Sequence, residues 1–226
     1  PPTTADPSTG SPAPSPGSPA GRPQLVPSRD PCAPRRAGVV AALLRLSRLV
    51  AGELRTGAGE LGLTPAQAEV LRFAARIRPD MATPGQLARL LGVRSPTAIG
   101  IVAPLIERGL LVRRPHPYDR RRSILALTAA GRALHERLER LTADLEATLA
   151  DLEPPVLEQI EAGLAALVGV FVRSGRLVVA APCAGCVHFR PDAAPGTPRP
   201  HRCALLRRNL STDEAAMNCP EHVAAG

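Results

Sequence analysis

Four of the five cysteines of this chain lie within one short C-terminal segment. A close pair, Cys183 and Cys186, is followed by two single cysteines, Cys203 and Cys219. Thiolates bind soft metal ions, and a Cys-x2-Cys pair with two later ligands is a typical zinc spacing. The segment also holds three alternative ligands: His188, His201 and His222. The spacing predicts one four-thiolate metal centre rather than disulfides or four unrelated thiols, because the rest of the chain is typical of a cytoplasmic protein.

A run of arginines is the second group with an evident chemistry. It contains five arginines and one acid, Asp119, which makes the local formal charge +4: Arg113, Arg114, Arg120, Arg121 and Arg122. Such a cluster is costly to bury and suits contact with phosphates or with a DNA minor groove. A basic run can also be only a solvated surface. Its place directly after a predicted helix-turn-helix favours DNA contact.

The helix-turn-helix is predicted from capping residues. Thr83 and Pro84 begin a short helix that ends at Gly92. Ser95 caps a second helix, which ends near Gly109. Its buried face is predicted from helical spacing to be Ile99, Val102 and Ile106. Two short strands then enclose the arginine run, so the pattern predicts a helix-turn-helix followed by a β-hairpin wing.

The remaining helices carry apolar stripes with little else in the chain to cover them. A first helix is predicted over residues 38–56, ended by Gly57 and Gly59. Thr64 begins a second helix. Beyond the wing, two long helices are predicted, from Thr128 to about residue 151 and from Pro154 onward. The stripes of the first and the last two helices favour a homodimer.

Composition supports a polyanionic partner. The net charge is +8, the isoelectric point is about 10.7, and all 28 basic residues are arginine. Aromatic residues make up only 2% of the chain, with no Trp, which argues against base-stacking platforms for RNA or single strands. No continuous apolar run approaches 18 residues and no secretory signal is evident, so we expect a cytoplasmic protein without a membrane span.

The predicted fold class is therefore mainly α with a small β-hairpin: a winged helix-turn-helix with dimerisation helices and a small metal-binding module. The predicted domains are a disordered Pro-rich tail over residues 1–36, the winged-helix domain over residues 37–175, and the Cys-rich module over residues 176–226. His116 and His135 are expected at the surface. No catalytic triad, phosphate loop or paired-carboxylate constellation is present, so the chain is not expected to be an enzyme.

The winged-helix part resembles the MarR family of transcription regulators, from about Val39 to Arg173. The resemblance rests on the Ser95-Pro96 helix start, the exit Ile106-Glu107-Arg108-Gly109-Leu110-Leu111, and the wing signature Asp119-x-Arg121-x-x-x-Leu125-x-Leu127-Thr128 followed by Gly131. It implies a homodimeric repressor or activator that binds double-stranded DNA. By the same resemblance, Arg121 would reach the minor groove, and Asp119 would hold the wing arginines in place.

The second helix departs from the family pattern. Gly100 and Ile101 stand where family members often carry a polar and a basic residue, and Pro104 inside the helix is expected to disturb it. Contacts with the base edges are then predicted for residues near the start of this helix, and Ile101 is predicted to contact a thymine methyl group. The predicted DNA-contact set of the helix is Arg94, Ser95, Thr97, Ala98 and Ile101, and the wing adds Arg113, Arg114, Asp119, Arg120, Arg121 and Arg122.

The cysteine segment is similar to the cluster-binding pattern of high-potential iron–sulfur proteins. The resemblance rests on the run Cys183-Ala-Gly-Cys186-Val-His-Phe189, followed by Cys203-Ala-Leu205, Leu210 and Cys219. It implies a [4Fe–4S] cluster, with zinc as the alternative. Apart from Phe189 the segment lacks that family's aromatic coat, and exposure of a cluster tunes its potential.

Three functions follow from these patterns. The first is a DNA-binding regulator that responds to redox state or metal through its four-cysteine centre. The second is the same regulator with a structural zinc segment, sensing a small organic ligand. The third is an iron–sulfur electron-transfer protein, which would leave the wing and the helix-turn-helix unexplained.

Overall fold

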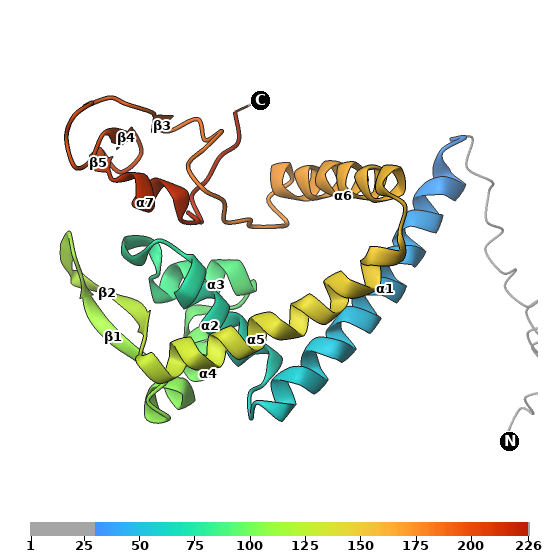
Figure 1. The fold of residues 1–226 in the computed structure, drawn as a ribbon, viewed down its shortest axis with the longest axis horizontal. Coiled ribbons are helices and arrows are strands. Elements are labelled where there is room, and N and C mark those ends of the chain that lie inside the picture. The colour runs from blue at the N-terminus through green and yellow to red at the C-terminus, as the bar shows by residue number, and fades with distance from the viewer. Residues whose placement is uncertain (1–29, 226) are drawn as a thin grey trace, which may run out of the picture. The chain divides into compact units, whose positions relative to one another are not determined.

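A computed structural model describes residues 30–225 of the chain. Residues 1–29 of the predicted disordered tail lie outside these described residues. The described chain divides into two units, with the boundary between Ser47 and Arg48. The second unit holds the helix-turn-helix, the wing and the cysteine segment together (Figure 1).

Helix α1 spans Ala33–Glu60, so it begins earlier and ends later than predicted. The two glycines expected to end it lie inside the helix. Gly57 is buried, and a Cβ atom there would lie 2.6 Å from Cδ1 of Leu141. Gly57 thus permits a close approach of a later helix, and the chain turns only at Gly62, which has a φ of 66°.

The helix-turn-helix forms at the predicted caps. Thr64 begins α2 (Pro65–Arg76) and makes a full capping box with Gln67. A short 3-10 turn, η1 (Pro79–Met81), leads to α3 (Pro84–Leu91). The Thr83 side chain accepts a hydrogen bond from the Gln86 backbone, and Gly92 ends α3 in the left-handed conformation. Local capping chemistry therefore sets the boundaries of α2 and α3.

Helix α4 (Ser95–Glu107) differs from the prediction in two respects. Its N-cap is Arg94, without a side-chain hydrogen bond, and Ser95 is its first residue. Its buried residues are Ala98, Val102 and Leu105, whereas Ile99 is 44% exposed. Both stripes have helical spacing, and packing in the core selects the one that ends in the fully buried Leu105. The helix continues through Pro104.

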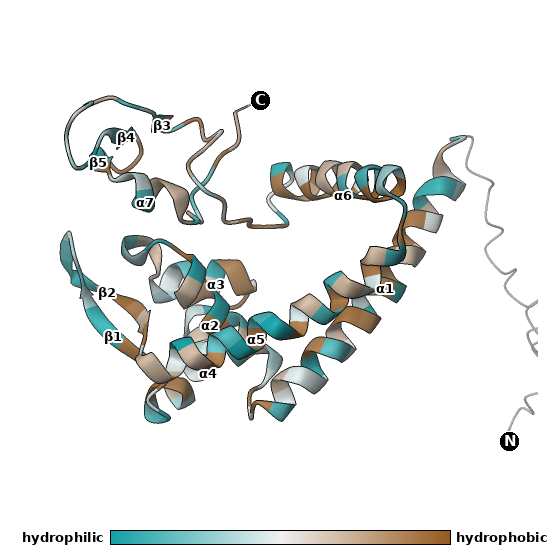
Figure 2. Ribbon diagram, viewed as in Figure 1, coloured by the Kyte–Doolittle hydropathy of each residue, from teal (hydrophilic) through white to brown (hydrophobic). Residues whose placement is uncertain are grey.

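The wing is an antiparallel hairpin of β1 (Leu111–His116) and β2 (Asp119–Leu127). The register shifts between Pro115 and His116, just before the tip. Leu111, Leu125 and Leu127 are buried at the base of the hairpin. Its outer part is hydrophilic (Figure 2). The base is thus fastened to the core while the arginines project from it.

Two long helices follow the wing. Thr128 caps α5 (Ala129–Thr148) through the Gly131 backbone, and the short turn η2 (Leu149–Asp151) leads to α6 (Pro154–Arg173). Leu138 is fully buried against the core, but α6 has no buried residue. Most apolar residues of α6 are therefore exposed within the described chain.

Helix α6 is also long and apolar enough to cross a membrane when length and composition alone are considered. Its mean hydropathy is 1.6, with 0% of the residues buried. Helices α3 and α4 pass the same test only when they are taken together as one span, and that span is bent by 109°. This test does not overturn the prediction, because Glu158 and Glu161 interrupt the apolar run of α6 and length and composition alone do not establish a membrane span.

The C-terminal segment adds a second small sheet to the predicted hairpin. Strands β3 (Phe189–Arg190), β4 (His201–Cys203) and β5 (Arg208–Leu210) pair antiparallel in that order. The short helix α7 (Thr212–Ala216) follows, with a capping box from Ser211 to Glu214. A small apolar cluster forms around Cys183, Cys203 and Leu210. The fold is mainly helical with small antiparallel sheets, as the predicted winged-helix class requires.

Gly131 is a position where a side chain cannot be accommodated. A Cβ atom there would lie 2.0 Å from the Leu110 carbonyl oxygen, a backbone atom that cannot move freely. We expect Gly131→Ala to lower the free energy of unfolding by about 3 kcal/mol, measured by urea denaturation. Gly85→Ala is the control, because its Cβ would meet nothing within 4 Å. Equal stability of the two variants would contradict the close approach.

Candidate nucleic-acid interface and four-cysteine cluster

The predicted contact residues of the helix-turn-helix are only partly at the surface. Arg94, Ser95 and Thr97 are exposed at the start of α4. Ala98 is 1% exposed and belongs to the core, so its predicted contact with bases is wrong. Ile101 is partly buried against the same core. Sequence reasoning missed Ile99, which is exposed beside Thr97, because it had been placed on the buried face.

The wing arginines all lie at the surface: Arg113, Arg114, Arg120, Arg121 and Arg122. Asp119 does not pair with any of their guanidinium groups. Its Oδ1 accepts a hydrogen bond from the backbone N–H of Arg121 at 3.0 Å, which stabilises the start of β2. The wing thus presents a concentration of positive charge with no neutralising partner among the described residues, as phosphate contacts require.

All four predicted ligand cysteines line one cavity. Cys183, Cys203 and Cys219 are buried and Cys186 is partly exposed, and all are free thiols. The cavity has a volume of about 10 Å³, roughly the space of one water molecule. Within residues 30–225, no group of three or more His, Cys, Asp or Glu side chains is placed so closely that it forms a metal site. The four cysteines therefore line one cavity, but the described side chains are not gathered into a metal-binding group in this structure.

The histidines differ in their relation to this cavity. His188 and His222 line it together with Phe189. His201 lies outside its lining and contacts the Phe189 ring, with 5.3 Å between the ring centres. Two of the three alternative ligands therefore lie next to the cysteines.

A buried arginine from the winged-helix region faces the cysteines. Arg78 lies between α2 and η1 and is 0% exposed. Its Nη1 and Nη2 atoms lie 3.7 Å from Sγ of Cys183 and 4.0 Å from Sγ of Cys219. Its Nε atom donates to Oδ1 of Asp80 at 2.7 Å. The guanidinium group therefore has a carboxylate on one side and two sulfur atoms on the other.

Electrostatics of this cluster follow from burial and from the guanidinium groups. Burial raises the pKa of the Cys183 and Cys219 thiols, and Arg78 only partly offsets this. Burial by itself would raise the pKa of Asp80, but Arg208 and Arg78 together bring it below its ordinary value. Burial would lower the pKa of Arg78, yet Asp80 and the two sulfurs raise it. The Asp80 carboxylate and the Arg78 guanidinium group are thus charged at neutral pH.

Comparison with known proteins identifies the DNA-binding part. Residues 61–122, from the end of α1 to the wing, match the MarR family profile. This region is a MarR-family winged helix-turn-helix domain. Members of the family are transcription regulators and not enzymes. No curated protein matches the chain in sequence.

Solved structures agree with this assignment. The crystal structure of CouR from Rhodococcus jostii RHA1 bound to p-coumaroyl-CoA is 26% identical with a TM-score of 0.51, covering 57% of this chain and 90% of CouR. The structure of RV1404 from Mycobacterium tuberculosis has 25% sequence identity and a TM-score of 0.50, and the match covers 59% of this chain and 92% of RV1404. A MarR transcriptional regulator from Methanosarcina mazei Go1 has a TM-score of 0.53, and the match covers 61% of this chain and 98% of that regulator. Because its sequence identity is only 17%, it supports the fold alone.

The cysteine segment docks on the MarR-family domain. The backbone N–H of Arg78 donates to the Asn218 carbonyl at 2.9 Å, and Ile77 forms a β-bridge with Asn218. Glu221 accepts a hydrogen bond from Gln86 of α3 at 2.6 Å and pairs with Arg89. The segment therefore contacts the region just before the helix-turn-helix and α3 itself.

The wing tip is part of the same contact. Tyr118 lies at the tip, and its hydroxyl accepts a hydrogen bond from Arg199 at 2.9 Å. The Arg208 guanidinium carbon lies 4.6 Å from the centre of the Tyr118 ring. His116, predicted at the surface, is 8% exposed. Its position is fixed by Asp80, and no sequence pattern indicates that contact.

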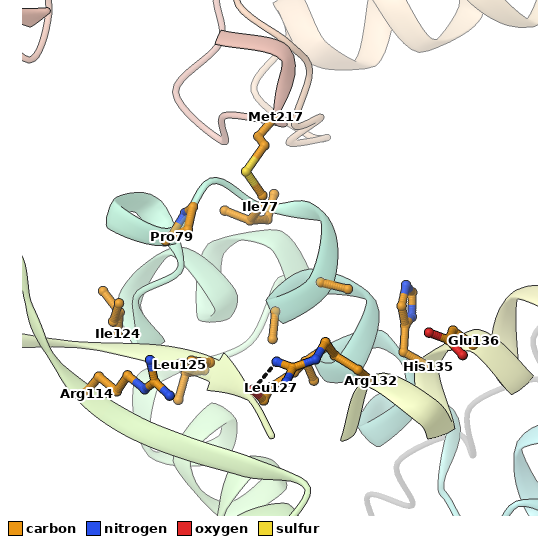
Figure 3. A pocket seen from close by; sticks show the side chains of 13 residues that line it. Ile77, Pro79, Arg114, Ile124, Leu125, Leu127, Arg132, His135, Glu136 and Met217 are labelled. Atoms are coloured by element: carbon orange, nitrogen blue, oxygen red, sulfur yellow. Dashed lines mark hydrogen bonds between the residues drawn. The ribbon is translucent and has the colours of Figure 1, made fainter. Parts of the chain in front are cut away.

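A pocket of about 440 Å³ lies beside the base of the wing (Figure 3). Apolar residues such as Ile77, Leu125 and Met217 line it, together with two arginines, His135 and Glu136. One of these, Arg132, donates to the Leu127 carbonyl at 3.1 Å. Burial lowers the pKa of His135 below its ordinary value. A largely apolar pocket with a few polar groups suits a small organic ligand.

Proposed function

We propose that the chain is a sequence-specific, double-stranded DNA-binding transcription regulator that acts in the cytoplasm as a homodimer. The observation that carries the proposal is the unpaired arginine wing directly after α3 and α4. The fold holds the base of the wing in the core and leaves Arg121 exposed. Arg94 and Thr97 at the start of α4 are the candidates for base contacts, and Ile99 replaces Ala98 as an apolar contact.

The homodimer is supported by the uncovered apolar faces. Exposed large apolar residues recur along α6, among them Ile160, Leu164 and Val168, and along α1, among them Leu46 and Val50. A single chain buries none of α6, so a second copy provides the partner surface. The acidic charge between Glu136 and Glu161, eight acids against two arginines, keeps this side of the protein away from DNA.

We further propose that Cys183, Cys186, Cys203 and Cys219 hold one metal centre. Two features support it: the four thiols line one cavity, and a buried guanidinium faces two of them. A single zinc ion requires four sulfurs at about 2.3 Å from one point. The sequence resemblance alone favours an iron–sulfur cluster of the [4Fe–4S] type, with zinc as the alternative. The regulator would then respond to redox state or metal supply.

The pocket at the base of the wing favours a second candidate. In this alternative the regulator senses a small organic ligand, and the cysteines hold a structural zinc ion. Arg114 and Arg132 would provide the charged contacts in this pocket. CouR, one of the similar structures, was solved with an acyl-CoA bound. An electron-transfer role is least supported, because it assigns no task to the wing.

The DNA-binding proposal is tested with Arg121→Ala. Removing one wing guanidinium is expected to weaken duplex DNA binding by about 1–3 kcal/mol. The slope of log affinity against log salt concentration should also become shallower by roughly one, because one counterion fewer is released on binding. Fluorescence anisotropy over a salt series measures both effects. Arg137→Ala, an exposed arginine on α5, is the matched control and should bind as the wild type does. Unchanged binding by Arg121→Ala, with no salt dependence in the wild type, would refute the assignment.

A further inference from the structure

The three-stranded sheet of the cysteine segment has two faces of different chemistry. Its inner face packs in the small apolar cluster of the segment: Phe189, Cys203 and Leu210. Because side chains alternate along a strand, the residues next to these point to the opposite, outer face. The outer face is polar and consists of one residue from each strand: Arg190, Arg202 and Asn209.

The two arginines of the outer face are direct neighbours. Arg190 of β3 is the register partner of Arg202 in β4, and Arg202 is in turn opposite Asn209 of β5. Both arginines are exposed, and the Arg202 guanidinium group contacts the Asn209 amide oxygen at 3.4 Å. Like charges directly opposite each other destabilise a sheet. An anion bound across this row offsets the repulsion, so the outer face suits a negatively charged partner.

A third arginine lies at the turn between β4 and β5. Arg207 is exposed there, and its neighbours Leu206 and Arg208 line one pocket together with Arg122 of the wing. The turn therefore lies beside the wing arginines. We call Arg190, Arg202 and Arg207 the outer arginines.

The acids of the segment leave the outer arginines without a partner. Between Cys183 and His222 there are five arginines and four acids. Glu214 lies 3.9 Å from Arg199 and 3.1 Å from Arg208. The other acids lie elsewhere: Asp192 beside His201, Asp213 on α7, and Glu221 on Arg89. Within residues 30–225, no ion pair neutralises any of the outer arginines.

The segment is fastened to the wing tip, so the two basic surfaces adjoin. Tyr118 accepts a hydrogen bond from Arg199, and Arg208 lies over its ring. A duplex carries one negative charge per about 1.7 Å of its axis, so DNA bound by the wing also offers phosphates beside it. We propose that the outer arginines bind DNA phosphates next to those that the wing contacts, and that the cysteine segment thereby lengthens the DNA site. The inference rests on the proposed DNA binding, whichever metal the cysteines hold.

The test removes two of the outer arginines from the full chain, in the double variant Arg202→Gln/Arg207→Gln. The probe is a duplex that the wild type selects from a random-sequence library. We expect the affinity of the double variant to be lower by at least about tenfold at about 0.1 M salt. The slope of log affinity against log salt concentration should become shallower by roughly two for each bound chain, because two fewer counterions are released.

Arg137→Gln/Arg140→Gln is the matched control, since it removes the same charge from two exposed positions of α5. It should bind the duplex as the wild type does. Hydroxyl-radical footprinting gives a second readout, because it shows which parts of the DNA backbone are covered. The wild type should protect positions beyond those whose protection depends on Arg121. The double variant should lose these outer positions and keep the others.

The outcomes separate the inference from the function on which it rests. A wild type that selects no duplex overturns the proposed function. A wild type that binds a duplex, with a double variant of equal affinity and equal footprint, overturns the inference alone. So does a double variant that binds the duplex normally but loses binding to phosphatidylserine vesicles, which would assign the surface to lipid. If the double variant does not fold, Arg207→Gln alone decides, with an expected loss of about threefold or more and a slope shallower by roughly one.

Discussion

Cys203→Ser is expected to lose the metal centre and the ordered structure of the C-terminal segment. Few large apolar side chains are buried there: the cluster consists of Cys183, Cys203, Leu210 and Ala215, with Phe189 and Leu206 beside it. So small a core cannot stabilise the segment without help. Binding by four thiolates provides about 10–16 kcal/mol in small zinc modules, so metal binding would supply most of the folding energy.

Metal and sulfide analysis with an absorption spectrum, on protein purified without oxygen, measures this effect. Cys32→Ser is the control, because Cys32 is exposed and lies outside the cavity. The winged-helix core should stay folded in both variants, since its apolar cluster is built from α2, α3, α4 and the wing. A brown wild type containing sulfide supports the cluster. A colourless protein with one zinc per chain would reject it, and a Cys203→Ser variant with full metal content would reject the four-thiolate centre.

Leu164→Glu is expected to convert the homodimer into a monomer. Leu164 is 47% exposed on α6, within the uncovered apolar face, so a carboxylate there would be buried without a partner at the interface. A monomer contacts one half-site only. Affinity for a near-palindromic operator, with half-sites roughly 10 bp apart, should then fall by about 10²–10⁴-fold because the two half-sites are no longer linked.

Light scattering and DNA titration measure the two effects together. Gln159→Glu adds the same charge at a polar position of α6 and should remain dimeric. A wild type that is a stable monomer at working concentrations would contradict the homodimer. Recovery of the chain with membranes would instead assign the apolar face of α6 to lipid.

The parts of this protein that are readable from sequence are those determined by local chemistry. Thr64, Thr83 and Thr128 begin their helices as predicted, because a cap needs only its own side chain and a backbone N–H three residues later. The wing arginines are exposed because a hairpin with a charge of +4 cannot be buried. These features identified the winged helix before any long-range contact was considered.

Tertiary structure decided which of several equivalent local patterns is used. Ala98 and Ile99 both belong to stripes with helical spacing, and only the fit of α4 against the core places Ala98 inside. Gly57 reads as a helix breaker in the sequence, yet it lies within α1 because Leu141 approaches it there. In each case the competing choices have similar local energies, so packing with distant residues selects between them.

The connection between the cysteines and the wing is a tertiary property throughout. The cysteine spacing predicts a common centre, because the four residues are near one another in the chain. In the sequence, Arg78 and Asp80 stand out only as two opposite charges between the apolar residues Ile77 and Met81. Their partners are distant in the sequence, because 141 positions separate Arg78 from Cys219 and 128 positions separate Asp80 from Arg208. Burial makes these charges depend on one another, and only the folded chain brings them together.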